Sequence, residues 1–254
     1  MSGSISNKIV TNGLIFNLDS ANPKSYVSGS TRWDSIDLNN NFVTLTNGPS
    51  YSSNFAGIIS FDGSGDTLSQ SQLFNPSIRN GNIAGETPNI DFELTFEIVF
   101  RLKETLTGTT NIFRTDATSF ATPPLCLYRL SGNPINNLNS AAGYTKVTGG
   151  TAGLVYVTSY NLNQWYHFMM SMRKTSSTTG EWFLMRNGVI LTQSTLTDIS
   201  WWQNYSSSLT TQGNRIQAPN VLNHDRAIMR LYNKGLTQNE CLQNFNAIRD
   251  RFKI

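Results

Sequence analysis

The sequence has little cysteine. Its 254 residues include only Cys126 and Cys241, which lie far apart and lack the close spacing of metal-ligand pairs. Small domains held by several disulfides and cysteine-based zinc folds are therefore excluded. We expect both cysteines to be buried free thiols, and one long-range disulfide between them is the alternative.

Charge is also scarce. Charged residues make up 14 % of the chain, and the formal net charge is +3. Proteins that bind nucleic acid electrostatically gather basic residues on one face. The nearest approach to such a cluster is Arg249, Arg251 and Lys253. We interpret these three as cations that stabilise the C-terminal end of a helix, and we expect no nucleic-acid partner.

Long apolar runs are absent. No stretch approaches the roughly 20 apolar residues that span a bilayer. Residues 1–8 are polar and have no apolar region of the kind found in secretion signals. The sequence therefore predicts a protein that is made in a cytoplasm and does not insert into a membrane. We expect residues 1–8 to form a polar arm ahead of a domain over residues 9–254.

Motifs for common enzyme chemistries are missing too. The chain has no Gly-x-Ser-x-Gly elbow, no phosphate-binding glycine loop and no paired-histidine zinc signature. Acyl transfer, phosphoryl transfer and zinc chemistry have no support. The expectation is a protein without catalytic residues and without a cofactor, calcium excepted as described below.

Polar loop residues and aromatics are abundant. Asn, Ser and Thr make up about a third of the chain, and aromatic residues 11 %. This composition predicts many loops around a few bulky core residues. An Asn187-Gly188 pair between two apolar runs predicts a two-residue hairpin.

The residues from Phe92 to Arg101 alternate most regularly. Such alternation is typical of a strand in a sheet with one buried face. The apolar face would carry Phe92, Leu94, Phe96, Ile98 and Phe100, and the other face Glu93, Thr95, Glu97 and Arg101.

About a dozen segments resemble strands, without helices between them. This pattern predicts an all-β fold, an antiparallel two-sheet β-sandwich of the jelly-roll, concanavalin A-like kind with a short C-terminal α-helix. The predicted strands are 14–18, 43–45, 58–61, 92–101, 110–114, 124–129, 144–147, 154–158, 164–172, 181–186, 189–191, 211–217 and 227–232.

The C-terminal thirty residues predict a strand, a turn and a helix. Thr237 and Glu240 have the Thr-x-x-Glu spacing of a capping box, so a helix is expected from Thr237 to about residue 251. Its apolar positions, at the three-to-four spacing of one buried stripe, are Leu242, Phe245 and Ile248, flanked by Cys241 and Phe252.

A series of different short motifs extends along nearly the whole chain. They are Asn12–Asp19, Trp33, Asn47-Gly48-Pro49, Ser60–Gly63, Trp165–His167, Arg186–Val189, Arg230–Thr237 and Asn244–Asn246. With these motifs the sequence resembles the concanavalin A-like lectin/glucanase superfamily, in the laminin G-like branch common in bacteriophage and other virion proteins. The resemblance implies that residues 14–18 lie beside residues 227–232.

The resemblance to glucanases raises the question of a catalytic carboxylate pair. The comparable residues here are Glu93 and Glu97, with Thr95 where an acidic helper would lie. Four residues of regular strand separate them by about 13 Å, whereas glycosidase pairs lie roughly 5 to 9.5 Å apart. We therefore expect surface-facing carboxylates without a catalytic role.

Four further residues are candidates for chemistry. His167 lies between aromatic residues on a predicted core strand and is expected to be structural, and His224 is expected in a loop. Asp62 and Asp66 flank a glycine-rich turn whose oxygens are spaced closely enough for calcium. The alternative is a tight turn in which both aspartates accept bonds from their own backbone.

Trp201, Trp202 and Tyr205 form the most unusual aromatic cluster. Such residues stack on sugars and also anchor protein interfaces. Three interpretations remain open: packing against their own domain, a subunit or partner interface, and a glycan platform.

The expected function combines these observations. The residues predict a polar-surfaced binding or scaffold domain without catalytic machinery. The resemblance implies a virion structural protein of a phage, a capsid-attached decoration or fibre-like subunit that forms homo-oligomers with other virion proteins. A glycan-binding tail-fibre or receptor adhesin is the alternative, and a glycoside hydrolase the remote third.

Overall fold

The computed structural model describes residues 8–36, 41–70, 93–104, 109–114, 127–133, 137–147, 150–156, 160–196, 216–217 and 223–254. Side chains are not described for residues 69–70, 109–156, 196 and 216–217. In this part of the chain, no helix is long and apolar enough to cross a membrane.

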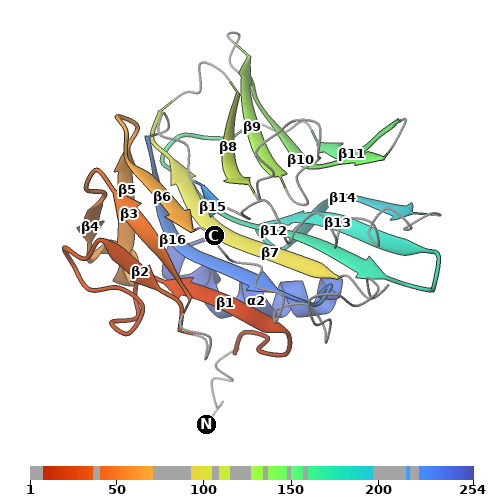
Figure 1. Ribbon diagram of the computed structural model, residues 1–254, viewed down its shortest axis with the longest axis horizontal. Coiled ribbons are helices and arrows are strands. Elements are labelled where there is room, and N and C mark those ends of the chain that lie inside the picture. Colours follow the sequence, from red (N-terminus) through yellow and green to blue (C-terminus); the bar gives the residue numbers. More distant parts are fainter. Residues whose placement is uncertain are drawn as a thin grey trace, which may run out of the picture.

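Eight strands form the large antiparallel sheet that organises the fold (Figure 1). Its order is β14-β13-β12-β7-β16-β5-β4, and β1 pairs with β16 beside β5. The strands are β1 (Leu14–Asp19), β4 (Ser50–Ser52), β5 (Ile58–Asp62), β7 (Leu94–Leu102), β12 (Trp165–Lys174), β13 (Gly180–Arg186), β14 (Val189–Leu196) and β16 (Asn223–Tyr232).

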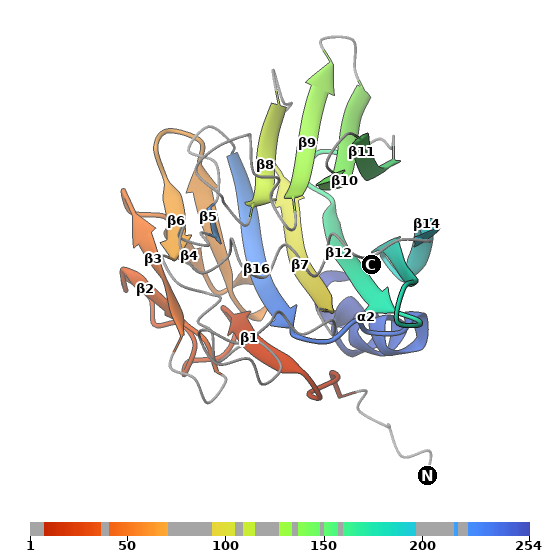
Figure 2. The same cartoon turned by 45° about the vertical axis from the view of Figure 1, so that its right-hand side comes forward.

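Two four-stranded sheets complete the β-structure of the described residues, with the orders β15-β6-β3-β2 and β11-β10-β9-β8. In both views β8 to β11 lie above β7 and β12, and helix α2 lies below (Figures 1 and 2). The expected all-β sandwich with a C-terminal helix is confirmed. The strands are β2 (Arg32–Asp34), β3 (Phe42–Thr46), β6 (Thr67–Gln70), β8 (Thr109–Arg114), β9 (Leu127–Asn133), β10 (Asn137–Val147), β11 (Gly150–Tyr156) and β15 (Ile216–Gln217).

Strand β16 is where the first and last parts of the chain meet. One of its edges pairs with β7, while the other pairs with β5 through Asn223–Arg226 and with β1 through Ile228–Tyr232. Between these two stretches, Ser20 donates from its backbone N and its Oγ to the carbonyl oxygen of Ala227, both at 3.0 Å. The predicted pairing of residues 14–18 with the closing strand is confirmed.

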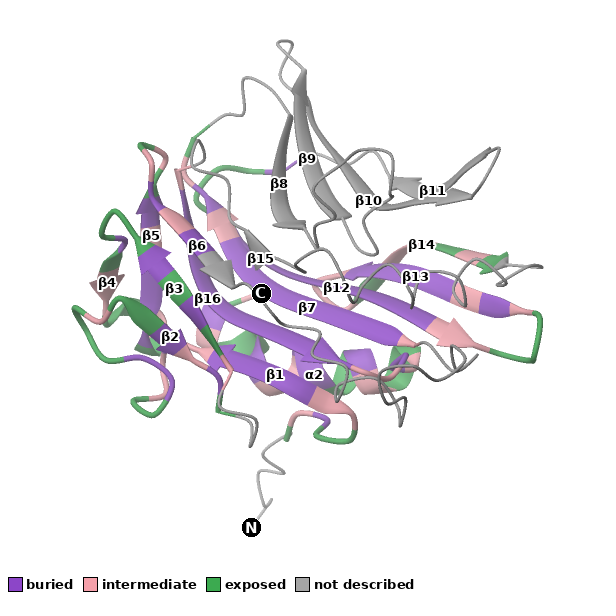
Figure 3. Ribbon diagram, viewed as in Figure 1, coloured by how far each residue is buried: buried purple, intermediate pink, exposed green. Residues whose placement is uncertain are grey.

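Strand β7 is buried on both faces (Figure 3). The prediction of a single buried face is wrong, because a period-two pattern shows which residues share a face and not what packs on it. Glu97 and Val99 point to the second face, and Val99 packs there with Ile248 and Phe252 of α2. The main core contains Leu94, Phe96, Ile98 and Phe100 of β7, as the alternation predicted, and also Leu102. The fifth residue predicted for this face, Phe92, lies outside the described residues.

Helix α2 (Gln238–Phe252) begins with the predicted capping box. The Thr237 hydroxyl accepts from Glu240 N at 3.2 Å, and the Glu240 carboxylate accepts from Thr237 N at 2.8 Å. The prediction that Leu242 belongs to the buried stripe is wrong, since its side chain is 39 % exposed. The buried residues of the helix are Cys241, Asn244, Phe245, Ile248 and Phe252.

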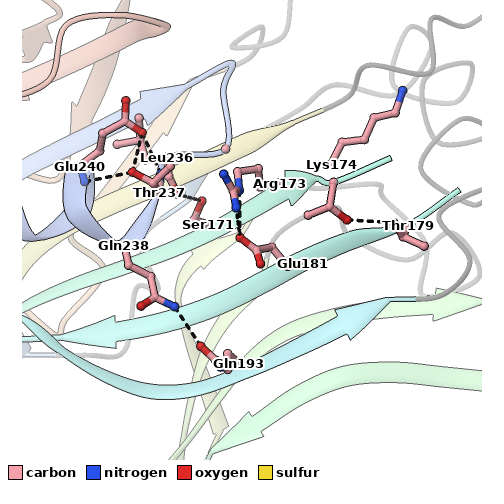
Figure 4. Close-up of polar contacts among 12 residues, drawn as sticks. Ser171, Arg173, Lys174, Thr179, Glu181, Gln193, Leu236, Thr237, Gln238 and Glu240 are labelled. Atoms are coloured by element: carbon pink, nitrogen blue, oxygen red, sulfur yellow. Dashed lines mark hydrogen bonds and ion pairs between the residues drawn. The ribbon is translucent and has the colours of Figure 1, made fainter. Parts of the chain in front are cut away.

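The first turn of α2 is fastened across the large sheet (Figure 4). Ser171 Oγ of β12 donates to the carbonyl oxygen of Leu236 at 2.7 Å, and Leu236 N donates to Thr95 Oγ1 of β7 at 2.8 Å. Gln238 Nε2 donates to Gln193 Oε1 of β14 at 2.9 Å. The helix thus covers a face of the large sheet.

The hairpin between β13 and β14 turns at Asn187-Gly188, as predicted. Both residues have positive φ, at 48° and 77°, as the favoured two-residue hairpin turn requires. A Cβ at Gly188 would lie 2.6 Å from Cδ1 of Phe245. Glycine therefore allows the turn and also allows α2 to pack close to it.

Candidate functional site

The carboxylates predicted to face the surface instead face α2. Glu97 lies on the covered face of β7 and its side chain is completely buried. Glu93 is partly buried, and its Oε1 and Oε2 accept from Lys174 N at 2.9 Å and from Gly235 N at 3.1 Å. The expectation of two surface carboxylates is therefore wrong, because the polar side of β7 is the side on which the helix packs.

Glu97 is the centre of a buried polar cluster. Its Oε1 accepts from Arg230 Nη1 at 2.6 Å and lies 3.1 Å from His167 Nε2. Its Oε2 accepts from Asn244 Nδ2 at 2.8 Å. Burial alone would raise the pKa of Glu97, but Arg230 and His167 lower it to about 2. The carboxylate is an ion held by a fixed set of partners.

Arg230 and Tyr232 of β16 belong to the same cluster. Burial by itself lowers the pKa of Arg230, but Glu97, with smaller contributions from Tyr232 and Asp19, raises the pKa above its ordinary value. Arg230 Nε also donates to Asn17 Oδ1 of β1 at 3.0 Å. Burial and the neighbouring Glu97 raise the pKa of Tyr232. The cluster thus contains a permanent cation, an anion and a neutral phenol.

Asn244 joins three segments of the chain. Its Nδ2 donates to Glu97 Oε2 of β7 and to Tyr232 OH of β16, each at 2.8 Å. Its Oδ1 accepts from Val10 N, also at 2.8 Å, so the amide fastens the start of the described chain to α2. The cluster is a structural clamp, and the fully buried Glu97 carboxylate at its centre is engaged on both oxygens.

The prediction for His167 is confirmed, and the prediction for His224 is wrong. His167 is structural, as expected: its ring stacks on Phe245 with centroids 5.7 Å apart, and its Nε2 pairs with Glu97. His224 is not in a loop but in β16, where it is buried and stacks on Phe61 with centroids 4.6 Å apart. The loop prediction failed because β16 begins four residues before the apolar run that marked it.

Asp62 and Asp66 form the turn that the sequence suggested as an alternative to calcium. Asp62 Oδ1 accepts from Ser64 N at 2.7 Å, and Asp66 Oδ2 accepts from Asp62 N at 3.0 Å. Over the described ranges, no group of three or more His, Cys, Asp or Glu side chains is arranged to hold a metal ion. Both carboxylates are engaged by backbone amides, which accounts for their spacing without an ion.

The remaining predicted residues divide between the described and undescribed parts of the chain. Cys241 is a buried free thiol, as expected, and burial raises its pKa. Cys126 lies outside the described residues, as do Trp201, Trp202 and Tyr205. The aromatic cluster therefore keeps its three interpretations.

Two polar residues within apolar patterns of the sequence indicate the buried cluster. Arg230 interrupts an apolar strand between Met229 and Leu231, and Asn244 lies on the apolar stripe of α2. A polar residue at a core position needs a partner. The two residues together indicate a buried polar network, although neither position in the sequence identifies Glu97 as the shared partner.

No protein family model and no curated protein matches this chain. Solved structures do. Trypanosoma rangeli sialidase matches with a TM-score of 0.58 and 14 % identity over 94 % of this chain and 33 % of its own. A mutant of that sialidase displaying trans-sialidase activity matches with a TM-score of 0.61 and 14 % identity over 96 % of this chain and 34 % of its own.

The botulinum neurotoxin type G receptor binding domain is similar at a TM-score of 0.59 and 10 % identity, over 92 % of this chain and 51 % of its own. This chain thus spans about a third of the sialidases and about half of the toxin domain. At such identities the likeness to an enzyme and to a receptor-binding domain shows the fold and not an activity. The fold is a lectin-like β-sandwich.

Proposed function

We propose that the chain is a non-catalytic structural or adhesive subunit of a phage-type virion, built on a lectin-like β-sandwich. One observation carries the non-catalytic part: Glu97, in the carboxylate pair comparable to that of glucanases, is buried under α2 and neutralised by Arg230. A general acid or base must be within hydrogen-bond reach of the substrate. The Glu97 carboxylate has no such access.

The virion part of the proposal is supported by the ordered motifs of the laminin G-like resemblance, from Asn12–Asp19 to Asn244–Asn246. Among the virion roles that the resemblance implies, a capsid-attached decoration or fibre-like subunit is our preferred assignment. Residues 1–8 would be the attachment segment. Homo-oligomers on the particle are expected.

Particle labelling tests this proposal. Antibodies against the purified chain should decorate intact virions from the source, and deletion of residues 1–8 should abolish incorporation while leaving the thermal melt of the purified chain unchanged. Intact virions without label would overturn the virion assignment. Incorporation at the wild-type level after deletion would overturn the attachment role of the arm.

An activity assay tests the non-catalytic part separately. The purified chain should release no sugar from a panel of oligosaccharides that includes sialosides. Turnover that persists in the Glu93→Gln and Glu97→Gln variants would point to another catalytic group, and turnover abolished by them would overturn the argument from burial.

A glycan-binding adhesin is the second candidate. It is supported by one neighbour of the same fold that is described as a receptor binding domain and by others described as sialidases. A glycan array with and without a calcium chelator tests it. Binding that is lost in Trp201→Ala and Trp202→Ala would identify these residues as the platform, and an empty array would dismiss the candidate.

A further inference from the structure

A row of polar and aromatic side chains crosses the large sheet on the face that carries α2. Ser50, Ser60, Asp225, Arg101 and Trp165 are direct cross-strand partners on β4, β5, β16, β7 and β12. Cross-strand partners share one face of a sheet. Trp165 packs against Phe252, the last residue of α2, with ring centroids 4.8 Å apart. The row therefore runs just beyond the end of the helix.

Asp225 holds two cations in this row. Its carboxylate, which is fully buried, accepts from Arg101 Nε at 2.5 Å and from Lys103 Nζ at 2.6 Å. Ser60 Oγ donates to the same carboxylate at 2.5 Å. The side chains of Arg101 and Lys103 remain 20 % and 30 % exposed. One buried anion thus positions two partly exposed cations, which leaves one positive charge in excess.

The guanidinium group of Arg101 contacts two aromatic rings. The carbon centre of its guanidinium lies 5.0 Å from the ring centroid of Trp165 and 5.5 Å from that of Phe55. Its Nε is used by Asp225. Among the residues that the structure describes, no side-chain or backbone oxygen accepts from Nη1 or Nη2. The two terminal nitrogens of this fixed fork, which together carry four N–H groups, are therefore available to an external acceptor.

The turn that carries Phe55 is strained. Phe55 and Ala56 both have left-handed backbones, with φ of 52° and 62°, which costs about 1 to 2 kcal/mol for each residue other than glycine. Arg251 of α2 holds the turn, since its Nε donates to the carbonyl oxygen of Phe55 at 2.6 Å. Strain of this kind persists where the surroundings fix it, and it concentrates at binding sites. Here it places an aromatic ring beside Arg101.

We infer that Arg101 and Lys103, beside the half-buried ring of Phe55, form a binding site for an oxyanion, that is, a carboxylate or a phosphate. The two cations supply charge-assisted hydrogen bonds to the oxyanion. The ring of Phe55, which also stacks on Phe252 with centroids 6.3 Å apart, is a fixed aromatic neighbour of Arg101. Asp225 is a positioning residue that aims both cations. The site lies outside the predicted aromatic cluster and does not depend on the proposed virion role.

An NMR titration of the full chain tests the site. The probes are sodium glucuronate, inorganic phosphate and neutral glucose, and the reporter is the indole N–H resonance of Trp165, assigned with Trp165→Phe. Glucuronate or phosphate should shift this resonance saturably, and glucose should not. Saturable shifts with both anions would mean that the site binds carboxylates and phosphates alike. A saturable shift with only one anion would show which of the two groups the site binds. A resonance that neither anion shifts saturably would overturn the site.

Variants separate the site from general ionic effects. Arg101→Met and Lys103→Met should each raise the dissociation constant by about tenfold or more. Arg101→Lys keeps the pairing with Asp225 and should still weaken binding, because the fork is lost. The matched control is Arg32→Met, since Arg32 also stacks on an aromatic ring, Phe42, and pairs with Asp34. Equal affinities in wild type, Arg101→Lys and Lys103→Met, or an equal loss in Arg32→Met, would overturn the inference.

Discussion

Arg230 on β16 donates through Nη1 to Glu97 on the adjacent strand β7 at 2.6 Å, and both side chains are almost completely inaccessible to water. The two residues are direct cross-strand partners, and α2 packs over them through Asn244. An ion pair in this position fixes where the closing strand and the closing helix meet the sheet. It also makes each partner dependent on the other.

Removal of the cation should strongly destabilise the fold. Arg230→Met leaves the buried Glu97 carboxylate without its principal counter-ion, and breaking such a pair costs about 3 to 5 kcal/mol. Urea unfolding followed by tryptophan fluorescence measures this loss. The double variant Arg230→Met/Glu97→Leu should be more stable than Arg230→Met alone, because no unpaired charge remains. A single variant as stable as wild type would contradict the assignment of the pair.

Acid should weaken the fold through the same group. The pKa of Glu97 falls from 4.5 to about 2 in the folded chain. A lowered pKa contributes stability that is complete above the unfolded value and is lost as pH falls through the folded value. The free energy of unfolding should therefore decline between about pH 4.5 and pH 2. Urea melts across this range should show a shallower decline in Glu97→Gln, and an identical slope in both proteins would contradict this origin.

Asn244 should be less replaceable than its helical position suggests. Asn244→Leu continues the apolar stripe of α2, but it leaves Val10 N without its acceptor and removes a donor from both Tyr232 OH and Glu97. Each buried polar group left unsatisfied costs about 1 to 3 kcal/mol. The matched control is Leu242→Ala on the exposed side of the same helix, which should change stability by about 0.5 kcal/mol or less. Faster hydrogen exchange of the Val10 amide in Asn244→Leu alone would locate the effect.

The contacts of Asn244 illustrate which features of the fold sequence patterns can predict and which they cannot. The capping box of Thr237 and the turn at Asn187-Gly188 were predictable because each depends on residues close together in the chain. The pairing of β1 with β16 followed from the family resemblance. The second buried face of β7 was not predictable, because it depends on a helix about 150 residues later in the sequence.

The same limit applies to the surface row. Arg101 and Asp225 become partners only through the register between β7 and β16, and Trp165 only through the register between β7 and β12. No local spacing records either register. Period-two alternation did place Arg101 on the face opposite Phe100, but it could not show that this part of the face extends past the end of α2.

A methyl group at Gly188 tests how closely α2 packs on the β13–β14 hairpin. Gly188→Ala introduces a Cβ 2.6 Å from Cδ1 of Phe245, whose ring is buried between the hairpin and His167. The strain of a left-handed alanine, about 1 to 2 kcal/mol, then adds to an overpacking cost of about 1 to 3 kcal/mol. Gly29→Ala is the matched control, because Gly29 has a similar φ of 84° and no atom within 4 Å of the added Cβ. Urea melts should therefore show a larger loss for Gly188→Ala than for Gly29→Ala. Equal losses would mean that the helix yields to the methyl group, so that the contact between Gly188 and Phe245 does not set the distance between α2 and the sheet.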